Sequence, residues 1–467
     1  MQKFYNLINN NYFIIISFFL FLFFSLNFHL YNVFNFYTYA AIFIISYSFL
    51  SYLFIKDFLK INRYLLIYFS LFLFLFLFYL YNFILSDITN IRLVTKIYFS
   101  YELLNYILFF YPFFFFFLIL LFIPFFIKID EETAKKFFLI VNIICLILLS
   151  ITILFLLFNP ILFNYVGHEG WARPFMYLFF FNDNDSSKLQ HAYILFISSY
   201  FIFIDYFKEK TKSKTLFFLA TINIFYLYLI FSFLFWGIIL LLFLLLFLFS
   251  KNKILFLKKI FNLFTIFLVL VFLLSYTISL KYKFFNKSYQ IENVEFSIID
   301  VTLLKFAKII YAIDFSKDKK LYYNIVIKNN VALKFMDNHY FKNINNPNLK
   351  IEKSINQINS TTDRVNKSLK CLNKKFLDAN FFSKKFTNCE SSVLNGSYLF
   401  GNIFILWFIC FFLALFFQTK TNNESKIFYF LFLIISFFHH TFENTFGFLI
   451  ISFFIANSIK RQTSNFS

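Results

Sequence analysis

The sequence predicts an all-α polytopic membrane protein with about twelve transmembrane helices. Hydrophobic residues make up 61% of the 467 residues, and Phe alone accounts for 87 of them, which leaves too little polar surface to cover a soluble core. Apolar runs of about 20 residues recur along the chain, and each is long enough to cross roughly 30 Å of hydrocarbon. Backbone groups in lipid must pair within their own segment, which favours helices, and the alternating strand pattern of an outer-membrane barrel does not appear.

The first half of the chain predicts eight spans. The first apolar run lacks a small-residue cleavage site, so we expect a retained helix and not a signal peptide. The run 215–250 is too long for one span and has a lysine cluster at each end, so we expect a helical hairpin that turns near Ser232–Gly237. The other expected spans lie near 11–28, 36–55, 64–86, 104–127, 137–162 and 189–207.

The second half predicts four spans, two of them short. We expect spans near 260–280 and 399–417, and two shorter helices within 427–459 that are separated by HHTFENT at 439–445. The expected organisation is therefore nine helices in 1–280, one hydrophilic loop domain in 281–398, and three helices with a short tail in 399–467.

The hydrophilic segment 281–398 is the single candidate soluble domain. Asp300 precedes an amphipathic stretch through residue 315, and a second amphipathic stretch runs over 355–376. Both predict helices, so we expect a mainly helical loop domain between the ninth and tenth spans. The alternative is that both stretches lie flat on the membrane surface.

The distribution of charge predicts the orientation. The net charge is +20, but the basic residues form short clusters between apolar runs and no nucleic-acid motif is present, so the expected partners are membrane lipids and not nucleic acid. With both termini in the cytoplasm, every cytoplasmic connection is basic and the loop 281–398 faces outward. The inside residues are Lys56, Lys60, Arg63, Lys128, Lys135, Lys136, Lys208, Lys210, Lys212, Lys214, Lys251, Lys253, Lys258, Lys259, Lys420, Lys426, Lys460 and Arg461.

Four cysteines divide into two pairs. Cys145 and Cys410 fall within expected spans, where each packs as a small hydrophobic side chain. Cys371 and Cys389 both fall in the outward loop, where an oxidising compartment permits a disulfide between them. Neither pair has zinc-site spacing, and there is no HExxH motif, P-loop, nucleotide fingerprint or nucleophile elbow, so no metal or cofactor is expected.

Polar side chains suited to chemistry gather in three outward-facing places. Arginine suits a diphosphate because its planar fork donates two charge-assisted hydrogen bonds, and His or Glu suits proton removal from a sugar hydroxyl. The same residues also fit simple structural roles, such as an interfacial anchor, a solvated helix face or the polar rim of a loop. The candidates are His168, Glu169 and Arg173 in one loop, Arg364 in the large loop, and His439, His440 and Glu443 in HHTFENT.

Three segments together resemble the O-antigen ligase/polymerase superfamily. ARPFMYLFFFNDNDSSKLQHAYILFI (172–197) is similar to its arginine-bearing entry segment, and SSVLNGSYLFGNIFILWF (391–408) is similar to its entry into the tenth span. ISFFHHTFENTFGFLIISFF (435–454) resembles its last hairpin. The order of a hairpin, a large outer loop and a short terminal hairpin is also similar, and the resemblance covers roughly residues 130–460.

The resemblance implies a metal-independent, inverting glycosyltransferase at the periplasmic face of a bacterial inner membrane. Its donor is a glycan on undecaprenyl diphosphate. A ligase passes the glycan to lipid A–core, whereas a polymerase passes it to a second lipid-linked repeat unit. By position, Arg173 matches the arginine of the family's first loop and Arg364 that of its large loop, and both are expected to hold diphosphate oxygens.

The chain departs from the family pattern in two places. The hairpin turn reads SFLFWG, without the usual Arg, and NCESS (388–392) stands where ligases place a His. Glu390 or His339 then takes the role of the base, or the activity is that of a polymerase. A transporter or flippase of lipid-linked glycan is a further alternative, although transporters usually carry ionisable residues inside their spans and these spans carry almost none. A non-catalytic envelope protein is the last alternative.

Overall fold

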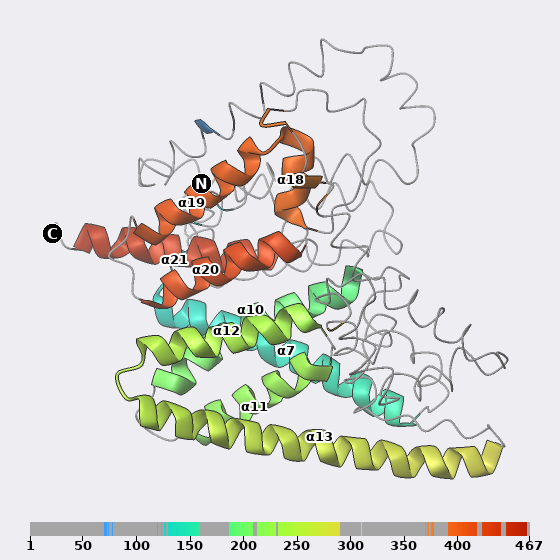
Figure 1. Ribbon diagram of the computed structural model, residues 1–467. Coiled ribbons are helices and arrows are strands. Elements are labelled where there is room, and N and C mark those ends of the chain that lie inside the picture. Colours follow the sequence, from blue (N-terminus) through green and yellow to red (C-terminus); the bar gives the residue numbers. More distant parts are fainter. Residues whose placement is uncertain are drawn as a thin grey trace, which may run out of the picture. The chain divides into compact units, whose positions relative to one another are not determined.

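The architecture is described from a computed structural model, shown in Figure 1. It describes residues 129–158, 186–208, 213–229, 232–289, 391–417, 423–439 and 445–464, together with isolated positions within 70–127 and 310–377. Every regular element in these ranges is an α-helix, as the sequence predicts. The chain forms two compact units, one of residues 1–138 and 367–467 and one of residues 139–366, and each is described by itself.

Two described helices are long and apolar enough to cross a membrane. These stretches are Glu131–Ile151, in α7 (Glu131–Phe158), and Lys253–Thr277, in α13 (Lys253–Tyr289). Shorter apolar stretches are Lys214–Leu229, Leu234–Phe249, Ile403–Phe417 and Gly447–Lys460. The spans expected near 11–28 and 36–55 lie outside the described residues, and those near 64–86 and 104–127 do so for the most part.

The expected helical hairpin is present in the second unit. It consists of α11 (Lys214–Leu229) and α12 (Phe233–Phe249). The turn lies earlier than predicted, because Ser232 is the extended N-cap residue (φ −104°, ψ 111°) and Gly237 lies inside α12. A Cβ atom added at Gly237 would meet nothing within 4 Å. At the turn, Trp236 Nε1 donates a hydrogen bond of 3.2 Å to the Leu227 carbonyl.

Aromatic contacts set the directions of the helices in this unit. Phe196 and Phe203 of α10 (Ser186–Lys208) contact Phe235 and Phe243 of α12, with ring centroids 6.0 and 5.6 Å apart, so these two helices run in the same direction. Phe207, near the end of α10, stacks at 4.2 Å on Phe256, near the start of α13. Helices α10 to α13 therefore alternate in direction (Figure 1), and both lysine-bearing connections of this unit lie at the same end.

The expected span near 399–417 corresponds to α19 (Ile403–Phe417), and a further short helix, α18 (Ser392–Phe400), precedes it at a corner. Gly401 separates them at φ 87°, a conformation that only glycine adopts without strain. Figure 1 shows α18 turned away from the axis of α19. Residues 392–398, assigned to the loop domain from sequence, are thus helical.

The terminal hairpin agrees with the sequence prediction. Helices α20 (Asn423–Phe438) and α21 (Thr445–Ser464) are separated at HHTFENT. The ninth expected span, near 260–280, lies mostly within the apolar stretch Lys253–Thr277 of α13 and differs from it only in its bounds. The amphipathic stretch 355–376 also differs, since residues 375–377 are not helical.

Helix α21 runs alongside the segment that precedes α7. Ser452 Oγ donates to the Ile119 carbonyl at 3.3 Å, and the rings of Phe453 and Phe126 lie 5.6 Å apart. Further along, Lys460 Nζ donates to the Ile129 carbonyl. Both segments therefore run in the same direction and end at the same place, where Lys460 lies within electrostatic reach of Asp130 and Glu131.

Candidate functional site

The start of α18 meets the end of α20 at a buried polar junction. Ser392 N donates a hydrogen bond of 3.2 Å to the His439 carbonyl, and Ser391 Oγ donates one of 2.9 Å to the Ser436 carbonyl. His439 is 2% exposed, and all three serines are buried as well. We call this cluster of Ser391, Ser392, Ser436 and His439 the α18–α20 junction.

Local chemistry explains why these residues meet. The last carbonyls of an α-helix have no partner within the helix and need donors from elsewhere. Ser391 and Ser392 supply such donors to the end of α20. Ser391 is also the extended N-cap of α18, and its hydroxyl accepts a hydrogen bond from Leu394 N at 3.3 Å. One pair of serines therefore stabilises two helix ends.

A glycine allows α18 to lie close to α19. A Cβ atom added at Gly396 would lie 2.1 Å from the ring of Phe404. That ring is buried and stacks at 5.6 Å on Phe400. The α18–α19 corner is thus packed so closely that only glycine fits at position 396 without displacing an aromatic ring.

A segment of the expected large loop is bound to the same corner. Asn402 N and Ile403 N donate to the carbonyls of Lys375 and Phe376 at 3.2 and 3.0 Å, and Asn402 Nδ2 donates to the Leu372 carbonyl at 3.3 Å. These bonds provide partners for first-turn amides of α19. We call the described residues of this segment, which are 369, 371, 372 and 375–377, the docked segment.

Cys371 packs the docked segment against α18 and α19. It is fully buried, forms a disulfide, and belongs to a cluster with Leu394, Tyr398 and Ile405. Cys145 and Cys410 are free thiols. Cys389, the predicted partner of Cys371, lies outside the described residues, so this pairing stays a prediction.

The structure describes two of the predicted site residues, His439 and Cys371. His439 is buried at the α18–α20 junction, and its expected contact with substrate stays a prediction. The other predicted residues lie outside the described part of the chain: His168, Glu169, Arg173, His339, Arg364, Cys389, Glu390, His440 and Glu443. Glu390 directly precedes the junction in sequence, and His440 directly follows it.

A second polar cluster lies within the apolar helices of the other unit. Asn142 of α7 and Asn223 of α11 are both fully buried and exchange side-chain hydrogen bonds of 2.8 and 2.9 Å. Asn142 Nδ2 also donates to Ser198 Oγ of α10 at 3.0 Å. Nearby, the hydroxyl groups of Ser150 of α7 and Tyr226 of α11 form a hydrogen bond of 2.5 Å. Three helices are thereby joined through polar side chains, as is common in membrane proteins.

This cluster was not predicted from the sequence. The available signal was the presence of Asn142 and Asn223 within two otherwise apolar runs. A polar side chain inside a span usually faces another helix, but a single sequence does not show which helix it faces.

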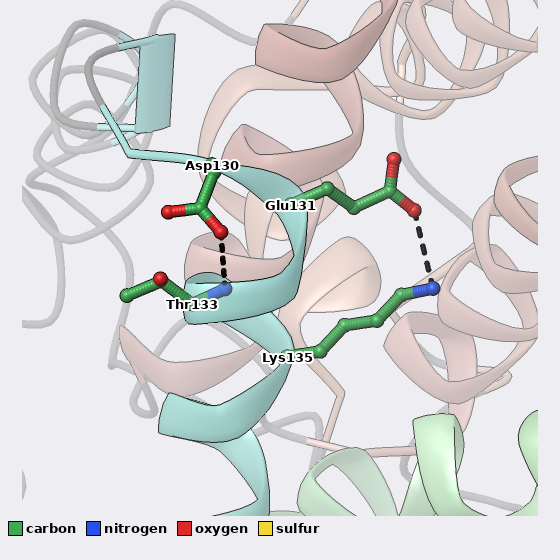
Figure 2. A network of polar contacts seen from close by, with 4 residues as sticks. All are labelled: Asp130, Glu131, Thr133 and Lys135. Atoms are coloured by element: carbon green, nitrogen blue, oxygen red, sulfur yellow. Dashed lines mark hydrogen bonds and ion pairs between the residues drawn. The ribbon is translucent and has the colours of Figure 1, made fainter.

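The start of α7 carries a different kind of polar network, shown in Figure 2. Asp130 Oδ2 accepts a hydrogen bond of 2.9 Å from Thr133 N, and Glu131 forms an ion pair of 3.1 Å with Lys135. Hydrogen bonds from the Thr133 side chain and backbone lower the pKa of the Asp130 carboxyl below its ordinary value. Asp130 therefore remains ionised at the positive end of the helix dipole, where a negative charge is favoured.

The described residues contain no group of three or more His, Cys, Asp or Glu side chains arranged to hold a metal ion. Comparisons of the chain with protein-family models, with curated proteins and with solved structures find no match.

Proposed function

We propose that this chain is a multi-span membrane glycosyltransferase of the O-antigen ligase type, which moves a glycan from undecaprenyl diphosphate to lipid A–core. The observation that supports this most is the α18–α20 junction. Two of the three segments that carry the resemblance, 391–408 and 435–454, meet there through the Ser392–His439 and Ser391–Ser436 hydrogen bonds. Two of the segments on which the resemblance rests are therefore in contact.

The arrangement of helices supports the proposed membrane topology of about twelve spans. In the unit of residues 139–366, helices α10 to α13 alternate in direction and carry lysines at a shared end. In the other unit, α21 and the segment that precedes α7 run in the same direction. Lys460 and the start of α7 lie together at their shared end. Each arrangement is consistent with basic residues on the cytoplasmic side, as the positive-inside rule requires.

The proposed reaction is an inverting displacement at the anomeric carbon of the donor sugar. A base removes the proton from an acceptor hydroxyl, whose oxygen then forms the new bond to that carbon. The bond to phosphate breaks, and the diphosphate leaves with the electron pair. The guanidinium groups of Arg173 and Arg364 stabilise the charge that develops on the leaving diphosphate. Candidates for the base are His168, Glu169, His339 and Glu390, and His439, His440 and Glu443 contribute to substrate binding.

A polymerase that joins lipid-linked repeat units is the second candidate. The departure that favours it is NCESS at 388–392, where ligases of the family carry a His. A transporter or flippase of lipid-linked glycan is the third candidate, although the buried polar residues of α7, α10 and α11 are uncharged and bonded to one another.

The surface glycan of a strain that lacks this protein distinguishes the candidates. Free lipid A–core with polymer remaining on its carrier is the expected result and indicates a ligase. Lipid A–core that bears one repeat unit indicates a polymerase, and a normal surface glycan contradicts both.

Cysteine labelling tests the orientation separately. A cysteine placed at Ser354 should react with an impermeant reagent in intact cells, whereas one at Ser213 should react only after lysis. The opposite pattern would exclude the orientation and a periplasmic active site with it.

A further inference from the structure

One face of α13 is exposed along its whole apolar part. Its side chains recur at helical spacing, and Ile254, Phe261 and Phe272 are 82%, 71% and 69% exposed. The opposite face, with Phe256, Leu263 and Phe267, is buried. We call the exposed side the α13 stripe, which consists of Ile254, Leu257, Lys258, Phe261, Thr265, Leu268, Phe272 and Tyr276.

The length of the α13 stripe matches the hydrocarbon thickness of a bilayer. From Ile254 to Tyr276 the helix rises about 33 Å at 1.5 Å per residue. The hydrocarbon core of a typical bilayer is roughly 30 Å thick. Tyr276, at the far end, belongs to the residue type that is enriched at membrane–water interfaces.

A lysine cluster lies at the other end of the α13 stripe. It gathers residues from the end of α10, the starts of α11 and α13 and the connection between α12 and α13, which meet through the Tyr206–Phe217, Phe207–Phe256 and Phe247–Phe256 contacts. Lys259 Nζ donates to the Tyr206 carbonyl at 2.6 Å and so fixes the start of α13 to the end of α10. We call this cluster the basic end, and it consists of Lys208, Lys214, Lys251, Lys253, Lys258 and Lys259.

We propose that α13 binds an anionic phospholipid, with its headgroup phosphate on the basic end and its acyl chains along the α13 stripe. Lys258 belongs to both surfaces and lies beside Leu257 and Phe261, so one molecule can contact charge and apolar surface together. Positive charge at the membrane surface attracts anionic headgroups, and exposed apolar side chains contact acyl chains without loss of hydrogen bonds. The proposal depends on membrane residence and not on glycan transfer.

Charge and side-chain size favour a lipid over a second copy of the chain. Helices that pair in membranes approach through small side chains, and Thr265 is the one small residue of the α13 stripe. Exposure also extends beyond the stripe to Leu255, Val269 and Leu273, which is wider than one helix contact requires. A symmetric pair of α13 helices running in the same direction would also bring two basic ends together.

The test uses the full chain in nanodiscs that contain equal amounts of phosphatidylglycerol and phosphatidylcholine. Native mass spectrometry counts the lipids that remain bound after release. The test variant is Lys251→Gln/Lys253→Gln/Lys258→Gln. The control is Lys135→Gln/Lys136→Gln, which removes two lysines that pair with Glu131 and Glu132 outside the basic end.

We expect the wild type and the control variant to retain phosphatidylglycerol in preference to phosphatidylcholine, and we expect salt to weaken this preference. One lysine near an anionic surface contributes about a fivefold preference for an anionic lipid. The preference for phosphatidylglycerol should therefore fall on the order of 100-fold in the triple variant at low salt. Excess inorganic phosphate should not displace the lipid, because it lacks the acyl contacts. Equal retention of both lipids by the wild type, unchanged preference in the triple variant, or displacement by phosphate would overturn the proposal.

A crosslinking experiment tests the competing occupant. Phe261→Cys is placed in a chain whose free thiols Cys145 and Cys410 are replaced by Ala, with Leu263→Cys on the buried face as the control. We expect neither variant to form crosslinked dimers in membranes. Efficient dimer formation by Phe261→Cys alone would assign the α13 stripe to a second copy of the chain.

Discussion

Asn142 and Asn223 exchange two side-chain hydrogen bonds between α7 and α11, at 2.8 and 2.9 Å. Each amide donates to the oxygen of the other, and both side chains are fully buried. Replacing only one member of the pair is unfavourable, because the amide oxygen of the other then loses its donor in an apolar interior.

We therefore expect Asn142→Leu to destabilise the protein by about 1–2 kcal/mol, measured by reversible unfolding in detergent. Asn223→Leu should have a similar effect. The double variant should lose less than the sum of the two, because no buried amide remains unpaired. Thr265→Val is the control: its hydroxyl bonds only to the Phe261 carbonyl of its own helix, so its effect should be small. Strict additivity of the two Asn variants would contradict this account of the pair.

Gly396→Ala should destabilise the α18–α19 corner by roughly 1–3 kcal/mol, the usual cost of overpacking. The added methyl group meets the buried Phe404 ring, which is fixed by stacking on Phe400. Gly237→Ala is the matched control, because nothing lies within 4 Å of the added atom and the position is helical. That change should instead stabilise the protein by about 0.5–1 kcal/mol. Equal effects of the two changes on thermal unfolding would exclude the close packing at position 396.

Asn402→Ala should make the disulfide of Cys371 easier to reduce. The change removes the hydrogen bond that Nδ2 donates to the Leu372 carbonyl and the one that Oδ1 accepts from Ser397 Oγ at 2.8 Å. Without these two hydrogen bonds, the docked segment should separate from the start of α19 on the order of tenfold more often. Alkylation after timed reduction measures the rate, and Asn423→Ala, at the exposed start of α20, is the control. A rate equal to that of the wild type would show that Asn402 does not hold the docked segment.

The stability contributed by Asp130 should depend on pH in a defined direction. Hydrogen bonds from Thr133 lower the pKa of Asp130 below its ordinary value of 3.8. Its contribution is therefore fully present above pH 3.8 and is lost as the pH falls through the lower folded-state pKa. Wild type should be more stable than Asp130→Asn at neutral pH, and the gap should close at acid pH.

Chemical unfolding of both proteins across this range measures the gap. Because Asp130 is exposed, salt should reduce it. Thr133→Val removes the side-chain donor and should weaken the dependence on pH. A gap that stays constant from neutral to acid pH would contradict the role of the charge.

Features that depend on short-range pattern could be predicted from the sequence. The lysines at both ends of 215–250 predict an even number of membrane crossings, and the structure contains two helices there, α11 and α12. HHTFENT was expected to separate two helices and lies between α20 and α21. Hydropathy and the positions of charged residues together predict these helices, because each apolar run is bounded by charged or polar residues.

Features that depend on tertiary contacts could not be predicted. The carbonyls of Lys375 and Phe376 accept hydrogen bonds from Asn402 and Ile403, and a single sequence does not report this contact. The corner at Gly401 follows from a backbone angle that hydropathy does not report. His439 lies outside α20, as predicted, but the pairing of its carbonyl with Ser392 and the burial of its side chain depend on contacts that the sequence does not report.

Glycan transfer by the purified protein, from an undecaprenyl-diphosphate-linked donor to lipid A–core in the presence of EDTA, tests the proposed function most directly. We predict transfer by the wild type and by Lys188→Ala, and a loss of about 100- to 1,000-fold in Arg173→Ala, the usual effect of removing one donor to developing negative charge. Arg173→Lys should also be impaired, because it keeps the charge but lacks the planar fork. Full activity of Arg173→Ala at matched protein levels would contradict the proposed diphosphate site, and absence of transfer by the wild type to either lipid A–core or a second lipid-linked unit would contradict the enzyme itself.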